Sequence, residues 1–308
     1  MAKVANINRT SSHQPSQFFI GTHLFIMIIF KTATGLAQYL DKQKKEGKTI
    51  GFVPTMGALH AGHLSLVKCS QQSHPITVVS IFVNPTQFND PKDFEKYPVT
   101  IEKDCLLLEK QHTDILFLPT IEEMYPYGTM NNHYYDLGNL DLILDGAYRP
   151  GHFQGVCQVV QRLLELTLPN ELFIGQKDYQ QCMVLKMLVN IMKVNIKIFV
   201  APIRRETDGL AMSSRNVLLN EIERQQATAI YQQLKWIQGN WNKKEILELK
   251  TTATQNLLKA GFDKVDYVEI ANANNLQLLD SVDPTKKMVA LIAAFLGKVR
   301  LIDNLILN

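Results

Sequence analysis

Cysteine is scarce in this sequence, and its four cysteines show no pairing pattern. They form neither a CxxC pair nor a metal-ligand spacing, and each lies in an apolar or helical stretch: Cys69, Cys105, Cys157 and Cys182. We expect reduced, mostly buried thiols of a cytoplasmic protein rather than a disulfide framework. Because none lies beside a base in a recognisable nucleophile motif, thiol catalysis is not indicated.

Long apolar runs and strong charge are missing as well. No segment reaches the roughly 20 uninterrupted apolar residues that a bilayer span needs. The formal net charge is only +3, and the basic residues are spread along the chain, so neither membrane insertion nor nucleic-acid binding is predicted. The apolar stretch at residues 18–30 is broken at Gly21 and lacks a cleavage site, so we expect residues 1–26 to be a disordered extension.

Strand-like and helical patterns alternate between residues 28 and 200. We expect strands at 28–30, 49–53, 76–83, 115–118, 172–174 and 195–200, with helices at 34–45, from about 62, and at 102–111, 156–168 and 180–192. Strands separated by helices pair in parallel through right-handed crossovers. The pattern predicts an α/β fold with a Rossmann-like doubly wound sheet over residues 27–203.

Beyond Pro202 the pattern changes to long polar helices at 221–238 and 243–260, followed by short strands near 267–270 and 288–295. We therefore expect a smaller α+β domain over residues 204–308, sharing a cleft with the first domain. In open α/β sheets, ligands bind beyond the carboxyl ends of the strands. Functional motifs are expected there.

The first such motif is PTMGALHAGH, residues 54–63, which follows a strand and opens a helix. Gly57 and Gly62 permit a tight turn, and His60 and His63 share one face of the first helical turn. Since a helix amino terminus attracts phosphate, the motif predicts a polyphosphate site. Two alternatives remain, a zinc site and a purely structural pair, but zincin helices use a spacing of four with an adjacent glutamate.

Four further motifs follow strands or open helices. They are IFVNPTQF at 81–88, RPGHFQGV at 149–156, FIGQKDYQQ at 173–181 and RRETDGLAMSSRN at 204–216. Taken alone, each has a plain structural reading: an Asn-Pro turn, helix capping and packing, a surface ion pair and a helix N-cap, respectively. Their amides, Lys177 and the Ser-Ser-Arg run equally suit a small polar substrate and phosphates.

The five motifs, in this order, resemble the pantothenate synthetase family of the HxGH adenylyl-transferring superfamily. The resemblance runs from about Met27 to near the carboxyl terminus and weakens after residue 220. It implies ATP-dependent ligation of pantoate and β-alanine through a pantoyl adenylate, with Mg²⁺, in a cytoplasmic homodimer. HxGH alone would also fit a nucleotidylyltransferase, and a non-catalytic nucleotide-binding protein is a further alternative.

The resemblance also assigns residues. His63 is implied as the catalytic proton donor, Lys177 would face the phosphates of ATP and Asp178 its ribose. The ATP site would comprise Met56, Gly57, Ala58, Leu59, His60, Ala61, Gly62, His63, Gly175, Gln176, Lys177, Asp178, Arg204, Met212, Ser213, Ser214 and Arg215. Pantoate and β-alanine would lie against Gln87, Gln181 and Asn84, and Arg149 and His152 would border the site.

Three positions depart from the family pattern: Gln176 stands where most relatives have Glu, Arg204 where many have Val, and Val99 where Arg is usual. Asp104, in an acidic helix, is a candidate Mg²⁺ ligand or a hydrogen-bond partner of one. From the sequence alone, a surface charge is the favoured interpretation of Asp104.

Overall fold

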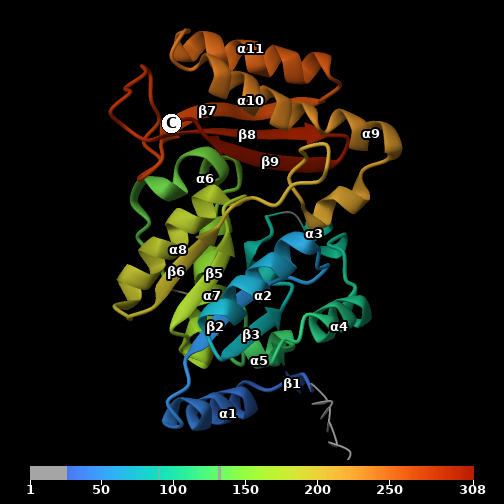
Figure 1. Cartoon of the computed structure of the whole chain (residues 1–308), viewed down its shortest axis with the longest axis vertical. Helices are drawn as coiled ribbons and strands as arrows, with labels where there is room; N and C mark the ends of the chain where they lie inside the picture. Colours follow the sequence, from blue (N-terminus) through green and yellow to red (C-terminus); the bar gives the residue numbers. More distant parts are fainter. Residues whose placement is uncertain (1–25, 90, 131–132) are drawn as a thin grey trace, which may run out of the picture.

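Two sheets make up the frame of the molecule. The structure is a computed structural model that describes residues 26–89, 91–130 and 133–308, so the expected extension lies, apart from Ile26, outside the described residues. The smaller sheet, β7 to β9, lies beyond the carboxyl ends of the strands of the larger one (Figure 1). Among the described residues, no helix is long and apolar enough to cross a membrane.

The larger sheet has six strands, and all of its pairings are parallel. The strands are β1 (Ile28–Phe30), β2 (Ile50–Thr55), β3 (Ile76–Ile81), β4 (Ile115–Phe117), β5 (Glu171–Gly175) and β6 (Lys197–Ala201). Their order, β1-β4-β3-β2-β5-β6, changes direction between the central strands β2 and β5. The predicted doubly wound sheet is confirmed, and ligands bind this class of sheet at such a switch point.

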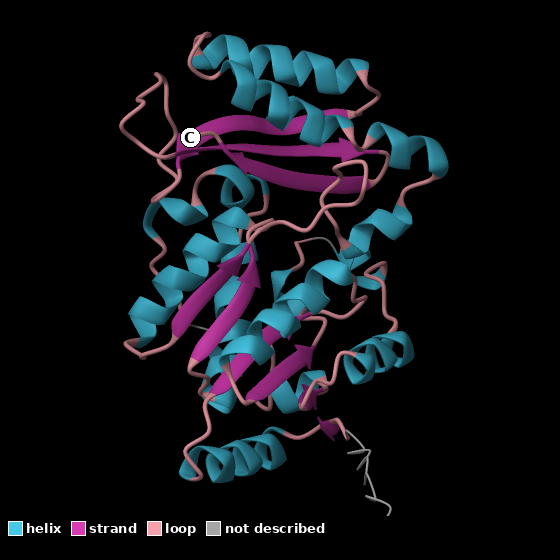
Figure 2. Cartoon of the chain, in the orientation of Figure 1, coloured by secondary structure: helices cyan, strands magenta, loops and turns pink. Residues whose placement is uncertain are grey.

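Helices cover both faces of this sheet (Figure 2). One face packs on α1 (Ala33–Lys45), α7 (His152–Thr167) and α8 (Tyr179–Met192), and the other on α2 (Ala61–Ser73) and α4 (Ile101–Lys110). Because side chains alternate across a strand, Phe52 belongs to the first core and its neighbour Val53 to the second. The central strands β2, β3 and β4 are thus buried on both sides, as is usual in parallel sheets, while the edge strands β1 and β6 are partly exposed.

The smaller sheet is antiparallel, in the order β7-β8-β9. It is formed by β7 (Lys264–Asn272), β8 (Met288–Leu296) and β9 (Val299–Ile306), and it packs on α10 (Ala229–Asn240) and α11 (Ile246–Lys259). Alternate residues of β8, such as Val289 and Leu291, join the core of the larger sheet instead. The two sheets therefore share one apolar cluster. The division predicted at residue 203, just past β6, stays a prediction.

Several sequence-based boundaries differ from the structure. The helix expected at 221–238 is two helices, α9 (Glu221–Gln226) and α10, and α7 begins at His152, four residues earlier than expected. The sequence reading missed strand β9 and the short elements α3 (Pro91–Glu95), α5 (Ile121–Met124), α6 (Leu144–Tyr148), η1 (Pro85–Gln87) and η2 (Gly138–Asp141). The helix start expected at the Ser-Ser-Arg run is the short 3-10 helix η3 (Ser214–Leu218), and both η1 and η3 carry residues of the site.

Candidate functional site

The buried carboxylate of Asp104 accepts hydrogen bonds from the loop between β2 and α2. Asp104 Oδ2 accepts from the Ala58 amide at 2.8 Å and Oδ1 from the Leu59 amide at 2.8 Å. Ala58 has a φ of +48°, and Gly57, with a φ of +81°, has little space for a side chain, because a Cβ would lie 3.0 Å from Asp104 Oδ2. The carboxylate thus stabilises a strained turn.

This arrangement corrects one reading of Asp104. The side chain is completely buried, so it is not a surface charge. It lines neither of the cavities described below, and both of its oxygens accept from backbone amides, so the geometry favours a positioning role over direct binding of Mg²⁺. Within the described part of the chain, no group of three or more His, Cys, Asp or Glu side chains could hold a metal ion.

The two histidines of the first motif cap helix α2. His60 Nδ1 accepts from the Gly62 amide at 3.1 Å, and His63 Nδ1 accepts from the His60 amide at 3.3 Å. The rings lie 4.1 Å apart between centroids. Since each Nδ1 is an acceptor, the proton of each neutral ring sits on Nε2, and both residues line the smaller cavity.

Both rings are neutral at pH 7. Burial, with a contribution from Lys177, lowers the pKa of His60 to about 4. Burial, with contributions from His60 and Lys177, lowers the pKa of His63 to about 3. The site therefore presents two neutral N–H donors at a helix amino terminus, which is an arrangement that binds anions without a fixed imidazolium charge.

The turn after β5 brings a cation to the same edge of the sheet. Lys177 Nζ lies 3.2 Å from Asp178 Oδ1. Burial opposes ionisation of Asp178, but Lys177 and Arg215 outweigh it and hold the pKa of this carboxyl below its usual value. The predicted Lys-Asp pair is thus an ion pair at the switch point, directly beside the two histidines.

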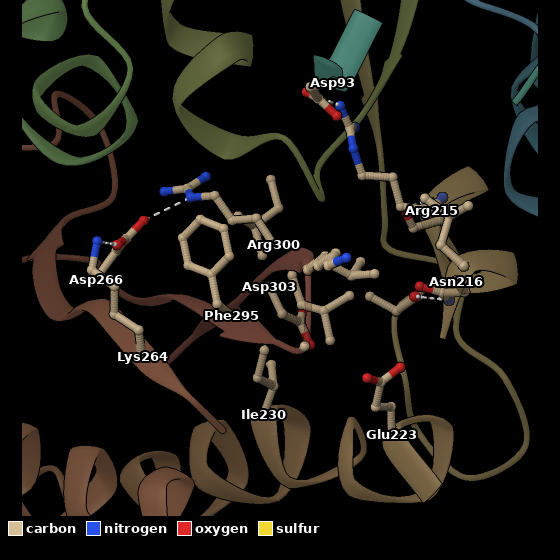
Figure 3. Close-up of a pocket in the computed structure, with 18 of the residues that line it drawn as sticks. Asp93, Arg215, Asn216, Glu223, Ile230, Lys264, Asp266, Phe295, Arg300 and Asp303 are labelled. Atoms are coloured by element: carbon tan, nitrogen blue, oxygen red, sulfur yellow. Dashed lines mark hydrogen bonds and ion pairs between the residues drawn. The ribbon is translucent and has the colours of Figure 1, made fainter. Parts of the chain in front are cut away.

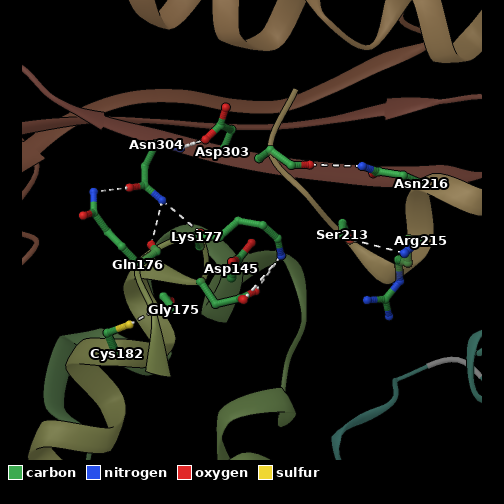
Figure 4. Close-up of polar contacts among 12 residues, drawn as sticks. Asp145, Gly175, Gln176, Lys177, Cys182, Ser213, Arg215, Asn216, Asp303 and Asn304 are labelled. Atoms are coloured by element: carbon green, nitrogen blue, oxygen red, sulfur yellow. Dashed lines mark hydrogen bonds and ion pairs between the residues drawn. The ribbon is translucent and has the colours of Figure 1, made fainter. Parts of the chain in front are cut away.

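The backbone of this turn is bonded to the smaller sheet. Asn304 Nδ2, on β9, donates to the carbonyl oxygens of Gln176 at 3.0 Å and Lys177 at 2.9 Å, and Asn304 Oδ1 accepts from Gln176 Nε2 at 3.1 Å (Figure 4). Gln176 and Asn304 therefore form a neutral amide pair. Sequence reasoning missed Asn304, because β9 was not recognised as a strand.

The Ser-Ser-Arg run lines the same cavity as the two histidines. Ser213 caps η3 by accepting from the Arg215 amide at 3.3 Å, and Ser214 Oγ donates to the carbonyl oxygen of Ala58 at 2.9 Å. The first and fifth motifs, 156 residues apart in the chain, are therefore in direct contact. Arg215 Nη2 lies 3.1 Å from Asp93 Oδ2, and its guanidinium lies over the Tyr97 ring at 5.4 Å.

The amide motif after β3 is closely packed against α7. Asn84 is 1% exposed and its side chain is fully bonded: it accepts from Tyr125 Oη at 2.7 Å and donates to Gln87 Oε1 and to the Gly155 carbonyl oxygen, both at 3.2 Å. Gln87 Nε2, in contrast, donates to the Met56 thioether, a weak acceptor. Asn84 thus orients Gln87, whose amide hydrogens can serve a ligand.

Arg149 and His152 support the same motif. His152 Nδ1 donates to the Gln87 carbonyl oxygen at 2.7 Å, and its Nε2 accepts from Arg149 Nη1 at 3.1 Å. Burial, followed by the neighbouring Arg149, lowers the pKa of His152 to about 3. This buried neutral imidazole therefore fixes the loop rather than acting as an acid or base near pH 7.

Two adjoining cavities open at this edge of the sheet, one of about 230 Å³ and one of about 1060 Å³. The larger runs between the sheets, where Arg215 points to Asp93 at one end and Arg300 to Asp266 at the other (Figure 3). Lys177, Asp178, Ser213 and Arg215 line both. The described structure thus provides room for a ligand larger than the smaller cavity alone could hold.

Most of the predicted site residues line the smaller cavity: Met56, His60, Gly62, His63, Asn84, Gln87, Gly175, Lys177, Asp178, Gln181, Arg204, Met212, Ser213, Ser214 and Arg215. Gly57, Ala58, Leu59, Ala61 and Gln176 do not line it and belong to the loops that support it. The sequence reading missed an apolar wall made by Phe82, Val156, Val159, Val160, Leu163 and Leu185. The only signal for it is the apolar pattern of α7, which equally predicts core.

The fold and cavities define an α/β protein whose sheet has, at its switch point, a cavity lined by two histidines, a lysine and an arginine. A family model described as Pantoate-beta-alanine ligase matches residues 28–306. The chain belongs to the pantoate-beta-alanine ligase family, which confirms the resemblance carried by the five motifs.

Individual relatives agree with this assignment. The chain is 41% identical over 286 residues to a pantothenate synthetase of Caldicellulosiruptor bescii, which covers 92% of this chain and 99% of the relative. The crystal structure of pantothenate synthetase from Thermus thermophilus matches with a TM-score of 0.84 at 36% identity, covering 91% of this chain and 99% of that one. A pantoate-beta-alanine ligase from Francisella tularensis, complexed with beta-gamma ATP and beta-alanine, matches with a TM-score of 0.78 at 36% identity, covering 91% and 98%.

Proposed function

We propose that this chain ligates pantoate and β-alanine to pantothenate, using ATP and passing through a pantoyl adenylate, with release of AMP and pyrophosphate. The observation that carries the proposal is the convergence of two neutral Nε2–H donors with Lys177 and Arg215 on one cavity. Membership of the ligase family and the beta-gamma ATP and beta-alanine bound by the Francisella relative support the choice of substrates.

The first step makes the carboxylate reactive, because a carboxylate oxygen is a poor leaving group. The pantoate carboxylate attacks the α-phosphorus of ATP, and negative charge collects on the departing pyrophosphate. Lys177 and Arg215 supply positive charge to it, and His60 and Ser213 donate hydrogen bonds. His63 is our candidate proton donor: its Nδ1 accepts from the His60 amide, so its Nε2–H is the group that faces the leaving oxygens and donates to them.

The second step needs little beyond positioning. The amine of β-alanine attacks the carbonyl carbon of the adenylate, the bond to AMP breaks, and no covalent enzyme intermediate forms. Gln87 and Gln181 would hold the hydroxyls and carboxylate of pantoate. Its dimethyl-substituted carbon would lie against the apolar wall near Phe82 and Leu163.

Mg²⁺ enters this proposal as part of the substrate MgATP, since Mg²⁺ is usually held largely by phosphate oxygens and water. We also propose a cytoplasmic homodimer without nucleic-acid partners, in which residues 27–203 bind nucleotide and pantoate and residues 204–308 form a lid domain. Light scattering coupled to size-exclusion chromatography tests the dimer.

The test follows ATP, AMP and pantothenate by mass spectrometry in purified protein supplied with Mg²⁺, pantoate and β-alanine. We expect AMP and pantothenate in equal amounts only when all substrates are present. His63→Ala and Lys177→Ala should reduce the rate by about 100-fold or more. A matched control is His112→Ala, because His112 lies just beyond the end of α4, outside both cavities. The proposal would be contradicted if AMP formed at the same rate without β-alanine, or if no AMP formed when pantoate was supplied.

A further inference from the structure

Two loops of the proposed ATP site are bonded to neighbouring residues of one strand. The turn that carries Lys177 contacts Asn304, and the loop that leads to Ser213 and Arg215 contacts Asp303 through Arg205. Both strand residues lie on β9 and are buried, at 1% and 3% exposed. The proposed mechanism uses neither of them, and neither belongs to the five motifs.

Asn304 fixes the first loop by its backbone. Its two Nδ2 hydrogens go to consecutive carbonyl oxygens, those of Gln176 and Lys177, and its Oδ1 accepts from Gln176 Nε2 (Figure 4). A buried amide that uses both hydrogens and its oxygen in this way permits one orientation of the turn. The side chain of Lys177 then leaves the turn toward both cavities.

Asp303 fixes the base of the second loop. It accepts from Arg205 Nη1 at 2.6 Å and Nη2 at 3.0 Å, a bidentate pair. Arg205 also donates to the Gly209 carbonyl oxygen at 3.0 Å and lies 3.9 Å from the centre of the Tyr231 ring. Since Arg205 pairs with Ala211 in a β-bridge, the pair anchors the segment that runs directly into Met212 and Ser213.

The two anchors are themselves joined. Asp303 Oδ1 accepts from the Asn304 amide at 2.8 Å, and the Asn304 carbonyl oxygen accepts from Arg205 Nη2 at 3.3 Å. We propose that Asp303 and Asn304 are positioning residues that set the spacing between Lys177 and the Ser213–Arg215 run. The inference rests on the proposed function, because that spacing matters only if both groups bind one polyphosphate.

The test compares wild type with Asn304→Asp, which keeps the shape of the side chain but removes both donors to the Lys177 turn. We expect the KM for ATP to rise, or kcat to fall, by about 10-fold or more, since small misplacements of charged groups cost rate steeply. The KM for pantoate should change by less than about twofold. Asp303→Asn should act in the same direction.

Glu269→Gln is the matched control. Glu269 forms an ion pair with Lys250 within the smaller domain, 2.6 Å from Nζ to Oε2, and lines neither cavity. We expect Glu269→Gln to change neither the KM for ATP nor the KM for pantoate. Thermal melts and circular dichroism report folding. If Asn304→Asp does not fold, Gln176→Ala removes only the bond to Asn304 Oδ1 from a partly exposed position, and should still raise the KM for ATP by about threefold.

A double-mutant cycle separates positioning from a general structural effect. Asn304→Asp should weaken ATP binding, measured by calorimetry, by about 10-fold in wild type but by about twofold or less in Lys177→Ala, because the two changes act through the same group. Equal losses in both backgrounds, or variants that lower only the melting temperature, would overturn the inference. Because calorimetry does not depend on pantothenate formation, a failure of the proposed function is recognised separately.

Discussion

We expect the buried carboxylate of Asp104 to contribute more to the free energy of unfolding than an exposed charge on the same helix does. In Asp104→Asn, the amide oxygen can keep the Leu59 bond and the bond from Thr100, but the amide NH₂ then faces the Ala58 N–H. One charge-assisted bond is lost and one buried donor is left without an acceptor, while Ala58 keeps its positive φ. We expect a loss of about 2–4 kcal/mol in the free energy of unfolding.

Urea unfolding followed by circular dichroism measures this loss, with Glu102→Gln as control, because Glu102 is an exposed carboxylate on α4. The control should stay within about 0.5 kcal/mol of wild type. The KM for ATP should also rise in Asp104→Asn, since the loop carries His60 and His63. Unchanged stability together with a shifted Mg²⁺ requirement would refute this reasoning and restore Asp104 as a metal ligand.

Three further predictions concern acid, packing and the amino terminus. Burial lowers the pKa of His152 from 6.5 to about 3, so between these values the unfolded chain binds the extra proton. Stability is therefore lost as the pH falls below 6.5, by about 2 kcal/mol for this group between pH 7 and 5. Urea midpoints at both pH values should differ less in His152→Asn. Gly155→Ala would place a Cβ 2.1 Å from the Thr86 carbonyl oxygen, so it should cost about 1–3 kcal/mol and raise the KM for pantoate. In the control Gly239→Ala the new Cβ meets nothing within 4 Å, so neither stability nor the KM for pantoate should change. Equal losses of stability in the two variants would contradict the packing argument. Deleting residues 1–26 should leave kcat/KM unchanged, since β1 begins at Ile28; lost activity would show that the segment matters.

The local sequence determined the six strands of the larger sheet and most of its long helices, because apolar periodicity and turn residues act over neighbouring positions. The apolar strand of 76–81 predicts burial on both faces whatever packs against it. The run from Pro54 to His63 likewise encodes its own turn and helix cap, as glycines and a capping histidine do locally. The position of the motifs at strand ends predicted the edge of the sheet where the cavity lies, whereas the individual site residues came from the family resemblance.

Only the tertiary structure decided which residues support that cavity. The pattern of 299–306 was not read as a strand because Asp303 and Asn304 interrupt its apolar alternation, yet these two are buried by partners about 100 or more residues away. Asp104 looked like a surface charge, because nothing in its helix shows that two backbone amides 45 and 46 residues distant lie within hydrogen-bond reach. The polar pattern of 221–238 predicted one helix, whereas the structure interrupts it at Ala227 and Thr228, where Ala227 is completely buried. Long-range hydrogen bonds to buried polar groups leave no periodic trace in the sequence, and for that reason the supporting residues could be found only in the folded chain.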